Sequence, residues 1–208
     1  MTVHANDNIK LISRNDETTI FTYFLSMLKS FIYFSLGAGF LFGAFQSIRK
    51  NSLNGFVDGF VIGIVSALIV VPIVIALDIF QKVKCYRKYK VIDFGVNQER
   101  RFLVEDEYSS AFDKMYSMLN DIKKVEIRHG DIESGIIEAV TKRSWKSFGE
   151  SIKIELFKTS KSKETVIVLE SKPRISLTMI DYCKNFENIE MIMEYILKGA
   201  GDRLALKN

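Results

Sequence analysis

The sequence contains little cysteine, proline, histidine or tryptophan. Among 208 residues there are two Cys, two Pro, two His and one Trp. Two cysteines are too few for the disulfide framework of a small secreted scaffold. Cys85 and Cys183 have no second Cys or His at ligand spacing, and the histidines, His4 and His129, stand far apart. We therefore expect no metal site and no cofactor.

Charge is absent from two long stretches in the N-terminal half. Residues 30–48 and 59–77 each contain 19 residues without Asp, Glu, Lys or Arg. As an α-helix each stretch would be about 28 Å long, close to the roughly 30 Å hydrocarbon core of a bilayer. We therefore expect two membrane-spanning helices. Such a pair nearly excludes a water-soluble enzyme, and the chain is also too hydrophobic to be disordered.

Positive charges near the ends of these stretches predict their orientation. Five lie within the nine residues after the second stretch, whereas the connection between the stretches holds only Arg49 and Lys50. By the positive-inside rule, both termini face the cytoplasm of a multi-pass protein in the inner membrane. The polar opening residues 1–19 are too long for the n-region of a signal peptide, so no cleavage is expected. The five cations are Lys82, Lys84, Arg87, Lys88 and Lys90.

The same five cations account for the positive charge of the whole chain. The net charge is +4, so the rest of the chain carries −1 without them. A nucleic-acid-binding domain would keep a strong positive excess, and no nucleic-acid partner is expected. We expect the five cations to meet anionic lipid headgroups at the membrane surface.

The sequence divides into five segments. Residues 1–26 read as a polar arm with an apolar, interfacial end, and residues 27–80 as the two-helix transmembrane hairpin. A basic juxtamembrane connector, 81–95, leads to a cytoplasmic α+β domain at 96–200, followed by a short tail at 201–208. About 105 residues are enough for one small core.

Hydrophobic periodicity within 96–200 predicts the order β-α-β-β-β-β-α. Asp106 stands at the N-cap of a helix that runs to Ile122. A curved antiparallel sheet that grips one or two helices satisfies this order, as in the repeat of the TATA-binding protein or a reduced helix-grip domain. The expected strands are 101–105, 124–128, 136–141, 152–156 and 165–169, and the last helix is 178–198.

Small residues recur at every fourth position in both apolar stretches. Such strips let two helix backbones approach closely in lipid. The interpretations are packing of the hairpin on itself, oligomerisation, and docking to another membrane subunit. The residues are Ser35, Gly39 and Gly43 in the first stretch and Gly55, Gly59, Gly63 and Ala67 in the second.

Three residues of the second stretch and its flanks invite a functional interpretation. Pro72 removes a backbone hydrogen bond and predicts a kink, with a gating hinge as the alternative. Asp58 and Asp78 flank the uncharged run rather than interrupting it, so neither marks an ion path through the bilayer centre. Asp78 stands one helical turn from Lys82, and we expect an ion pair at the interface.

Two polar segments of the C-terminal domain stand out. One contains the only tryptophan in a short connection between strands, where Trp145 either closes one end of a core or contacts a partner. The second, Asp181–Asn185 with Asn188, either fixes the last helix or offers a binding surface. As a partner face we take Trp145, Lys146 and Lys184. His129, Asp131 and Glu133 fall at a turn, where such residues are usually solvated, so we predict no catalytic residue.

These segments resemble an uncharacterised small α+β domain of bacterial proteins. In that domain a G-x-I-x-A strand leads to an S-W-x-S-x-G-E corner and a D-x-G-K-N-x-x-N helix. The matching positions are Gly135–Ala139, Ser144–Glu150 and Asp181–Asn188. The pattern has Gly where this chain has Cys183. The resemblance implies a bacterial origin and a compact domain, and no activity.

The leading hypothesis is a membrane-anchored cytoplasmic interaction module, an accessory subunit of a larger bacterial membrane assembly. Its partners would be membrane lipids and either another membrane protein or copies of itself. The alternative is a sensor or effector whose domain binds a small-molecule ligand and whose hairpins assemble through the small-residue strips to perturb the membrane. A lipid-modifying enzyme is a third hypothesis, and it would need His129, Asp131 and Glu133 in one pocket beneath the bilayer.

Overall fold

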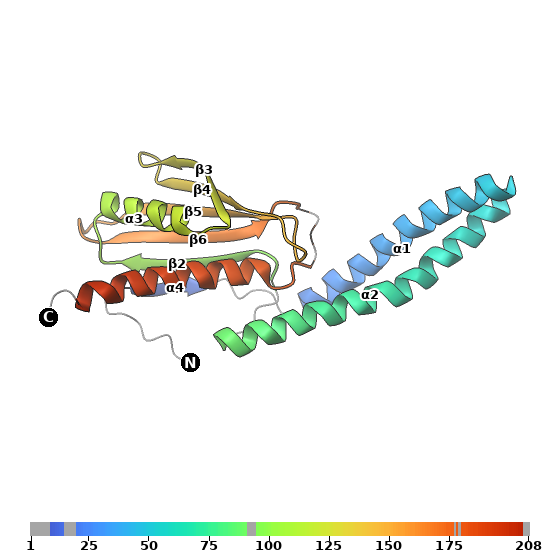
Figure 1. Ribbon diagram of the computed structural model, residues 1–208, viewed down its shortest axis with the longest axis horizontal. Coiled ribbons are helices and arrows are strands. Elements are labelled where there is room, and N and C mark those ends of the chain that lie inside the picture. The colour runs from blue at the N-terminus through green and yellow to red at the C-terminus, as the bar shows by residue number, and fades with distance from the viewer. Residues whose placement is uncertain (1–8, 15–19, 91–94, 177, 179, 206–208) are drawn as a thin grey trace.

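The computed structural model describes residues 9–14, 20–90, 95–176, 178 and 180–205. The chain forms two parts, a hairpin of two long helices and a sheet domain at one end of it (Figure 1). The loops at one end of the sheet face the hairpin, and the opposite end points away from it (Figure 1).

The hairpin consists of α1 (Ile20–Lys50) and α2 (Leu53–Tyr89). The turn between them is set by Ser52, whose Oγ accepts a hydrogen bond from the Asn54 backbone N–H at 3.2 Å. α2 continues through Pro72 without interruption and ends at Lys90, which has a left-handed backbone. Both helices are long and apolar enough to cross a membrane. The apolar segment 20–28 is the beginning of α1 rather than a separate interfacial element.

The small-residue strips of the two helices face each other. All seven residues of the strips are buried. A Cβ atom built on Gly59 would lie 2.3 Å from the Gly43 backbone N, and one on Gly63 would lie 2.3 Å from Gly39 Cα. Backbone therefore touches backbone at these positions, where only glycine fits. The structure thus places the strips inside the hairpin rather than on its outer surface.

The sheet domain contains an antiparallel sheet of six strands in the order β1-β2-β6-β5-β4-β3. From β2 to α4 the elements follow the predicted order β-α-β-β-β-β-α, which is confirmed. The finer likeness to a TATA-binding-protein repeat or a helix-grip domain stays a prediction. The elements are β1 (Ile9–Arg14), β2 (Gln98–Val104), α3 (Tyr108–Asp121), β3 (Val125–Asp131), β4 (Ile136–Thr141), β5 (Glu150–Lys158), β6 (Thr165–Pro173) and α4 (Lys184–Ala205).

One hydrophobic core lies between the sheet and both helices of the domain. The alternation of apolar and polar residues in the strands turns every second side chain toward this core. Ile154 is paired in register with Ile137 on one side and with Leu169 on the other. Residues of α3 and α4 belong to the same cluster, so both helices cover the same face of the sheet. They include Phe112, Leu119, Ile189 and Ile192.

Three expectations about element boundaries are wrong. Residues 9–14 of the predicted polar arm form β1, which pairs with β2 at the edge of the sheet. The N-cap of α3 is Glu107, and Asp106 instead forms an ion pair with Lys114. The last helix begins at Lys184 rather than at 178, because residues 182 and 183 have left-handed backbones that a helix cannot include.

The close backbone contact in the hairpin predicts opposite effects for the same substitution at two kinds of glycine. Gly59→Ala or Gly63→Ala should push the helices apart and lower the free energy of unfolding by roughly 1–3 kcal/mol. A Cβ on Gly37 would meet nothing within 4 Å. Gly37→Ala should therefore be neutral, or stabilise the helix by up to about 1 kcal/mol. Denaturant unfolding of the purified full chain in detergent measures both, and equal effects at the three positions would contradict the proposed packing.

Candidate functional site at the junction of hairpin and sheet domain

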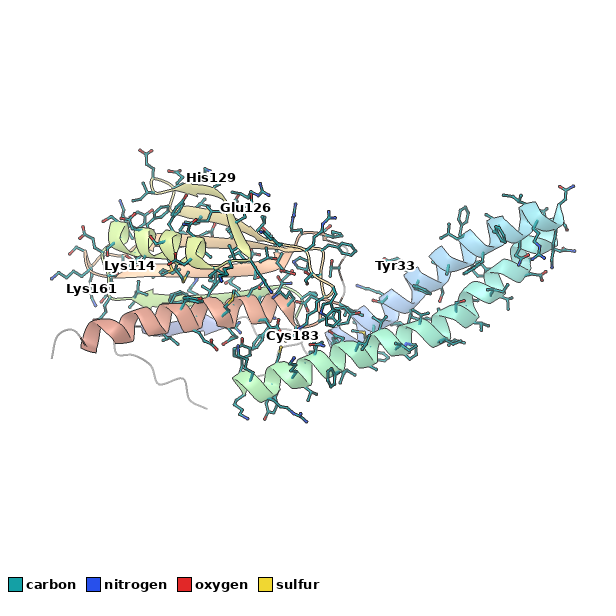
Figure 2. All side chains as sticks on the ribbon, viewed as in Figure 1. Tyr33, Lys114, Glu126, His129, Lys161 and Cys183 are labelled. Atoms are coloured by element: carbon teal, nitrogen blue, oxygen red, sulfur yellow. The ribbon has the colours of Figure 1, made fainter. Side chains whose placement is uncertain are left out.

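The end of α2 extends beyond the uncharged stretch and packs against the start of α4. From residue 78 to residue 89 the helix extends for about 18 Å. Buried residues along this extension are Asp78, Gln81, Lys82 and Cys85. Cys85 belongs to the same cluster as Cys183 and Phe186 at the beginning of α4, and the ring of Tyr89 meets the ring of Phe186 edge-on at 5.7 Å. Figure 2 shows Cys183 beside α2.

A buried ion pair lies at the hairpin end of this contact. Lys82 Nζ donates to Asp78 Oδ2 at 2.8 Å, and the side chains are 4% and 0% exposed. The hydroxyl of Tyr23, from α1, donates to the same carboxylate oxygen, and the ammonium group of Lys82 lies 5.0 Å from the centre of the Tyr23 ring. The three side chains therefore tie α1 to α2 where the apolar stretches end.

This geometry corrects one expectation about the basic connector. The side chain of Lys82 is not available to lipid headgroups, because it is buried and paired with Asp78. Lys84, Arg87, Lys88 and Lys90 are exposed. Lys88 lies 3.9 Å from Glu194 of α4, a contact too exposed to contribute much. Asp58, at the opposite end of the hairpin, pairs with Lys50 on the surface.

The two cysteines meet at this junction although they lie in distant parts of the sequence. The thiol of Cys85 donates to Glu187 Oε1 at 3.6 Å. The hydrogen bond with Cys85, together with burial, raises the pKa of the Cys183 thiol. Both thiols are free and buried, so their main role at this junction is packing.

Asp181 organises the turn that leads into α4. Its carboxylate accepts hydrogen bonds from the backbone N–H groups of Cys183, at 3.1 Å, and Asn185, at 2.9 Å. Cys183 has a φ of 65°, a region that glycine occupies freely and that costs other residues about 1–2 kcal/mol. The glycine that the resemblance implies at this position would suit this backbone. Burial raises the pKa of the Asp181 carboxyl, and the positive charge of Lys82 opposes that rise.

A buried network of hydrogen bonds continues from Asp181 across the sheet. The side chain of Asn185 donates to Asp181 at 3.0 Å and accepts from the Ser171 hydroxyl at 2.7 Å. Asn188 donates to Ser171 at 3.4 Å and to Glu150 at 3.3 Å. Every one of these side chains is at least 98% buried. The network fixes α4 on β5 and β6, as one of the two interpretations of these residues had it.

Glu150 is the acidic end of the network. The hydroxyl groups of Thr141 and Ser147 donate to its two carboxylate oxygens, and the Glu150 backbone N–H donates to Thr141 Oγ1 at 2.9 Å. Hydrogen-bonding of this kind offsets the cost of burying a carboxylate. The buried polar residues of the segments Ser144–Glu150 and Asp181–Asn188 therefore mainly stabilise the domain through internal hydrogen bonds.

The tryptophan corner, residues 144–150, carries exposed aromatic side chains, in contrast to the buried network. Trp145 is 71% exposed and Phe148 is 65% exposed, so they do not close the end of a core. Of the two interpretations offered by the sequence, the structure contradicts that one. The Trp145 ring is positioned by Tyr182, at 6.0 Å between ring centres. Lys146 and Lys184 both pair with Glu187, at 3.0 and 3.6 Å. Within the expected partner face, Trp145 is thus the exposed member.

A pocket of about 760 Å³ separates this corner from the hairpin. Ser30 and Tyr33 of α1 and Val74 of α2 line one wall. Figure 2 shows Tyr33 on the hairpin near the end of the domain. The domain contributes loops after β4 and β6 to the other wall. The residues there include Trp145, Phe148, Pro173, Ile175 and Tyr182.

The remaining candidates lie far from the junction. Asp131 is the last residue of β3, Glu133 lies in the exposed turn between β3 and β4, and Figure 2 shows His129 on β3. Hydrogen bonds from Ser134 and from the backbone N–H of Glu133 lower the pKa of Asp131, as expected for a solvated turn. No group of three or more His, Cys, Asp or Glu able to hold a metal occurs among the residues that the structure describes. His4 lies outside them.

The buried ion pair predicts a large loss of stability when one partner is removed. Lys82→Met leaves the carboxylate of Asp78 buried and unpaired, and should lower the free energy of unfolding by about 3–5 kcal/mol. The double variant Asp78→Leu/Lys82→Met removes both charges and should recover most of that loss. Denaturant unfolding of the purified full chain in detergent measures both variants.

The chain provides a matched control for this prediction. Lys50 and Asp58 form the same kind of pair, but their side chains are 52% and 53% exposed. Lys50→Met should therefore change the unfolding free energy by no more than about 1 kcal/mol. Equal effects of Lys82→Met and Lys50→Met would show that burial of the Asp78–Lys82 pair does not matter.

Comparison with protein-family models and with curated proteins gives no match to this chain. The resemblance to a small bacterial α+β domain therefore stays a prediction. The junction combines a packed contact between hairpin and domain, a buried polar network, and an exposed aromatic corner beside a pocket.

Proposed function

We propose that this chain is a membrane-anchored interaction module. The hairpin spans the cytoplasmic membrane of a bacterium, and the sheet domain lies on the cytoplasmic side as a docking unit for a larger membrane assembly. Large apolar side chains on the outward faces of both helices support the membrane-spanning role, because water would disfavour such a surface. They include Phe40, Leu41, Phe45, Leu68, Ile69 and Ile73, all exposed.

The observation that carries the proposal is the buried joint between α2 and α4. A flexible tether would leave the domain free to rotate above the bilayer. Here Cys85 and Tyr89 of α2 pack against Cys183 and Phe186. α2 itself extends from the apolar stretch into this joint as one continuous helix. The domain is therefore held at a defined height and orientation, which suits a scaffold that presents a fixed surface to a partner.

The exposed cations at the domain end of α2 support the orientation. Lys84, Arg87, Lys88 and Lys90 follow the second apolar stretch, and the opposite end of the hairpin offers only Arg49 and Lys50. Loops with more Lys and Arg stay in the cytoplasm. The sheet domain and the N-terminal strand β1, which belongs to the same sheet, then share that side.

The alternative is a ligand-sensing effector, and the pocket at the junction favours it. Its volume of about 760 Å³ lies within the usual range of roughly 300–1,000 Å³ for ligand sites. The small-residue strips, however, face each other inside the hairpin, so hairpins would have to assemble through other faces. We assign no catalytic role, because His129, Asp131 and Glu133 occupy an exposed strand end and turn rather than a pocket beneath the bilayer.

The proposed topology predicts which new cysteines react from which side of the membrane. Leu53→Cys, at the exposed start of α2 beside the turn of the hairpin, should react with a membrane-impermeant maleimide on intact spheroplasts. Ser162→Cys, in the exposed turn between β5 and β6, should react only after the membrane is permeabilised. The native cysteines are buried and provide the low background. The reverse pattern would contradict the orientation, and labelling of both sites without permeabilisation would contradict the spanning hairpin.

The scaffold role predicts a stable partner. Gentle affinity purification of the full chain from native membranes, followed by mass determination of the intact particle, should give a second membrane protein in fixed stoichiometry. A particle that contains only copies of this chain would favour the sensor or effector instead. A monomer without partners would remove the basis of the interaction module.

A further inference from the structure

The end of the sheet that faces the hairpin combines exposed aromatic residues with positive charge. Every charged residue in the segments 142–149 and 173–176 is a cation. Three of these cations, Lys142, Arg143 and Arg174, are exposed. Arg174 lies beside the tryptophan corner, since its backbone N–H donates to the Gly149 carbonyl at 3.1 Å.

The residues that line the pocket show which part of the hairpin lies beside this end of the sheet. Tyr33 lies one helical turn inside the first uncharged stretch, and Val74 lies one turn inside the second. Both line the same pocket as Trp145. If the two uncharged stretches span the bilayer, this end of the sheet lies at the level of the headgroups and the first part of the acyl chains. This is the depth at which Trp and Tyr are enriched in membrane proteins.

The pocket has both apolar and polar walls. Its walls are largely apolar, with Val74, Phe148 and Ile175 among them, whereas Ser144 and Lys146 contribute polar groups. Glu150 and Asp181 also line it, but their carboxylates accept hydrogen bonds within the buried network. A ligand that matches these walls has a hydrocarbon part and a polar part. The neighbouring exposed cations favour a negative charge on the polar part.

We propose that the pocket between the hairpin and the tryptophan corner binds an anionic phospholipid from the cytoplasmic leaflet. An acyl chain lies against Tyr33, Val74 and Phe148, and the phosphate group lies near Lys142, Arg143 and Arg174. The inference rests on the proposed membrane-spanning hairpin and goes beyond it, because a spanning hairpin alone requires no lipid site. The lipid would also cover the aromatic residues that the fold leaves exposed.

Trp145 provides a direct probe, because it is the only tryptophan in the chain. The full chain is reconstituted in vesicles of phosphatidylcholine and phosphatidylglycerol, in which either one lipid or the other carries brominated acyl chains. Bromine quenches tryptophan fluorescence only at short range. We expect brominated phosphatidylglycerol to quench Trp145 more strongly than brominated phosphatidylcholine at the same molar fraction. Both leaflets have the same composition, so the orientation of the reconstituted protein does not affect the result.

Two charge-reversal variants separate a site from general attraction to the vesicle. Lys142→Glu/Arg143→Glu should abolish the preference for phosphatidylglycerol. Lys161→Glu/Lys163→Glu changes the net charge by the same amount at the exposed turn between β5 and β6, and should keep the preference. Figure 2 shows Lys161 at the end of the domain away from the hairpin.

Insertion of the hairpin is measured in the same vesicles by resistance to alkaline extraction. If the hairpin is inserted but Trp145 is quenched by aqueous acrylamide and by neither lipid, the lipid site is wrong and the anchored module stands. Equal quenching by both lipids, or loss of the preference in both variants, also overturns the anionic site. If the hairpin does not insert, the proposed function fails and the lipid site fails with it.

Discussion

The buried ion pair between Asp78 and Lys82 determines how the two parts of the molecule are joined. A charge pair is costly to bury, and the short contact with Lys82 and the Tyr23 hydroxyl offset part of that cost at Asp78 Oδ2. It lies where the uncharged stretch of α2 ends, and from Asp78 onward one side of the helix carries buried polar side chains. Beyond this point Cys85 and Tyr89 can pack on α4, and the positive charge of Lys82 acts on Asp181 of the sheet domain.

The polar residues of the segments Ser144–Glu150 and Asp181–Asn188 likewise hold parts of the structure together. Glu150, Asp181 and Asn188 would be read as a binding surface if only their chemistry were considered. Each is buried and hydrogen-bonded to side chains or backbone groups of the domain. Such a network holds α4 in one position on the sheet, since a partly satisfied network would be worse than an apolar one. The exposed functional surface is therefore left to the neighbouring residues of the same loops.

Sequence periodicity was sufficient for the elements whose burial repeats regularly. The alternation around Ile152 and Ile154 predicts a strand, and the strip with Gly59 and Gly63 predicts a close helix contact. Periodicity was insufficient where contacts between distant parts of the sequence determine the structure. Residues 9–14 form a strand because they pair with the edge of β2. Cys85 contacts Cys183 because α2 continues beyond the apolar stretch. Periodicity also left the exposure of Trp145 open, because an aromatic residue in a short loop either closes a core or contacts a partner.

A lipid at the tryptophan corner would restrict where a protein partner can bind. The corner, the basic end of α2 and the pocket would all face the membrane, and Lys146 and Lys184 are already engaged by Glu187. In the proposed orientation, surfaces of the described sheet away from the hairpin would stay accessible from the cytoplasm. One is the free edge of β3, one of the two outer strands. Another is the sheet face opposite the helices, where Lys153 is paired in register with Glu138 and Glu170. Because an unpaired strand edge offers backbone hydrogen bonds to any extended segment, β3 is one surface that a scaffold held in this orientation would present.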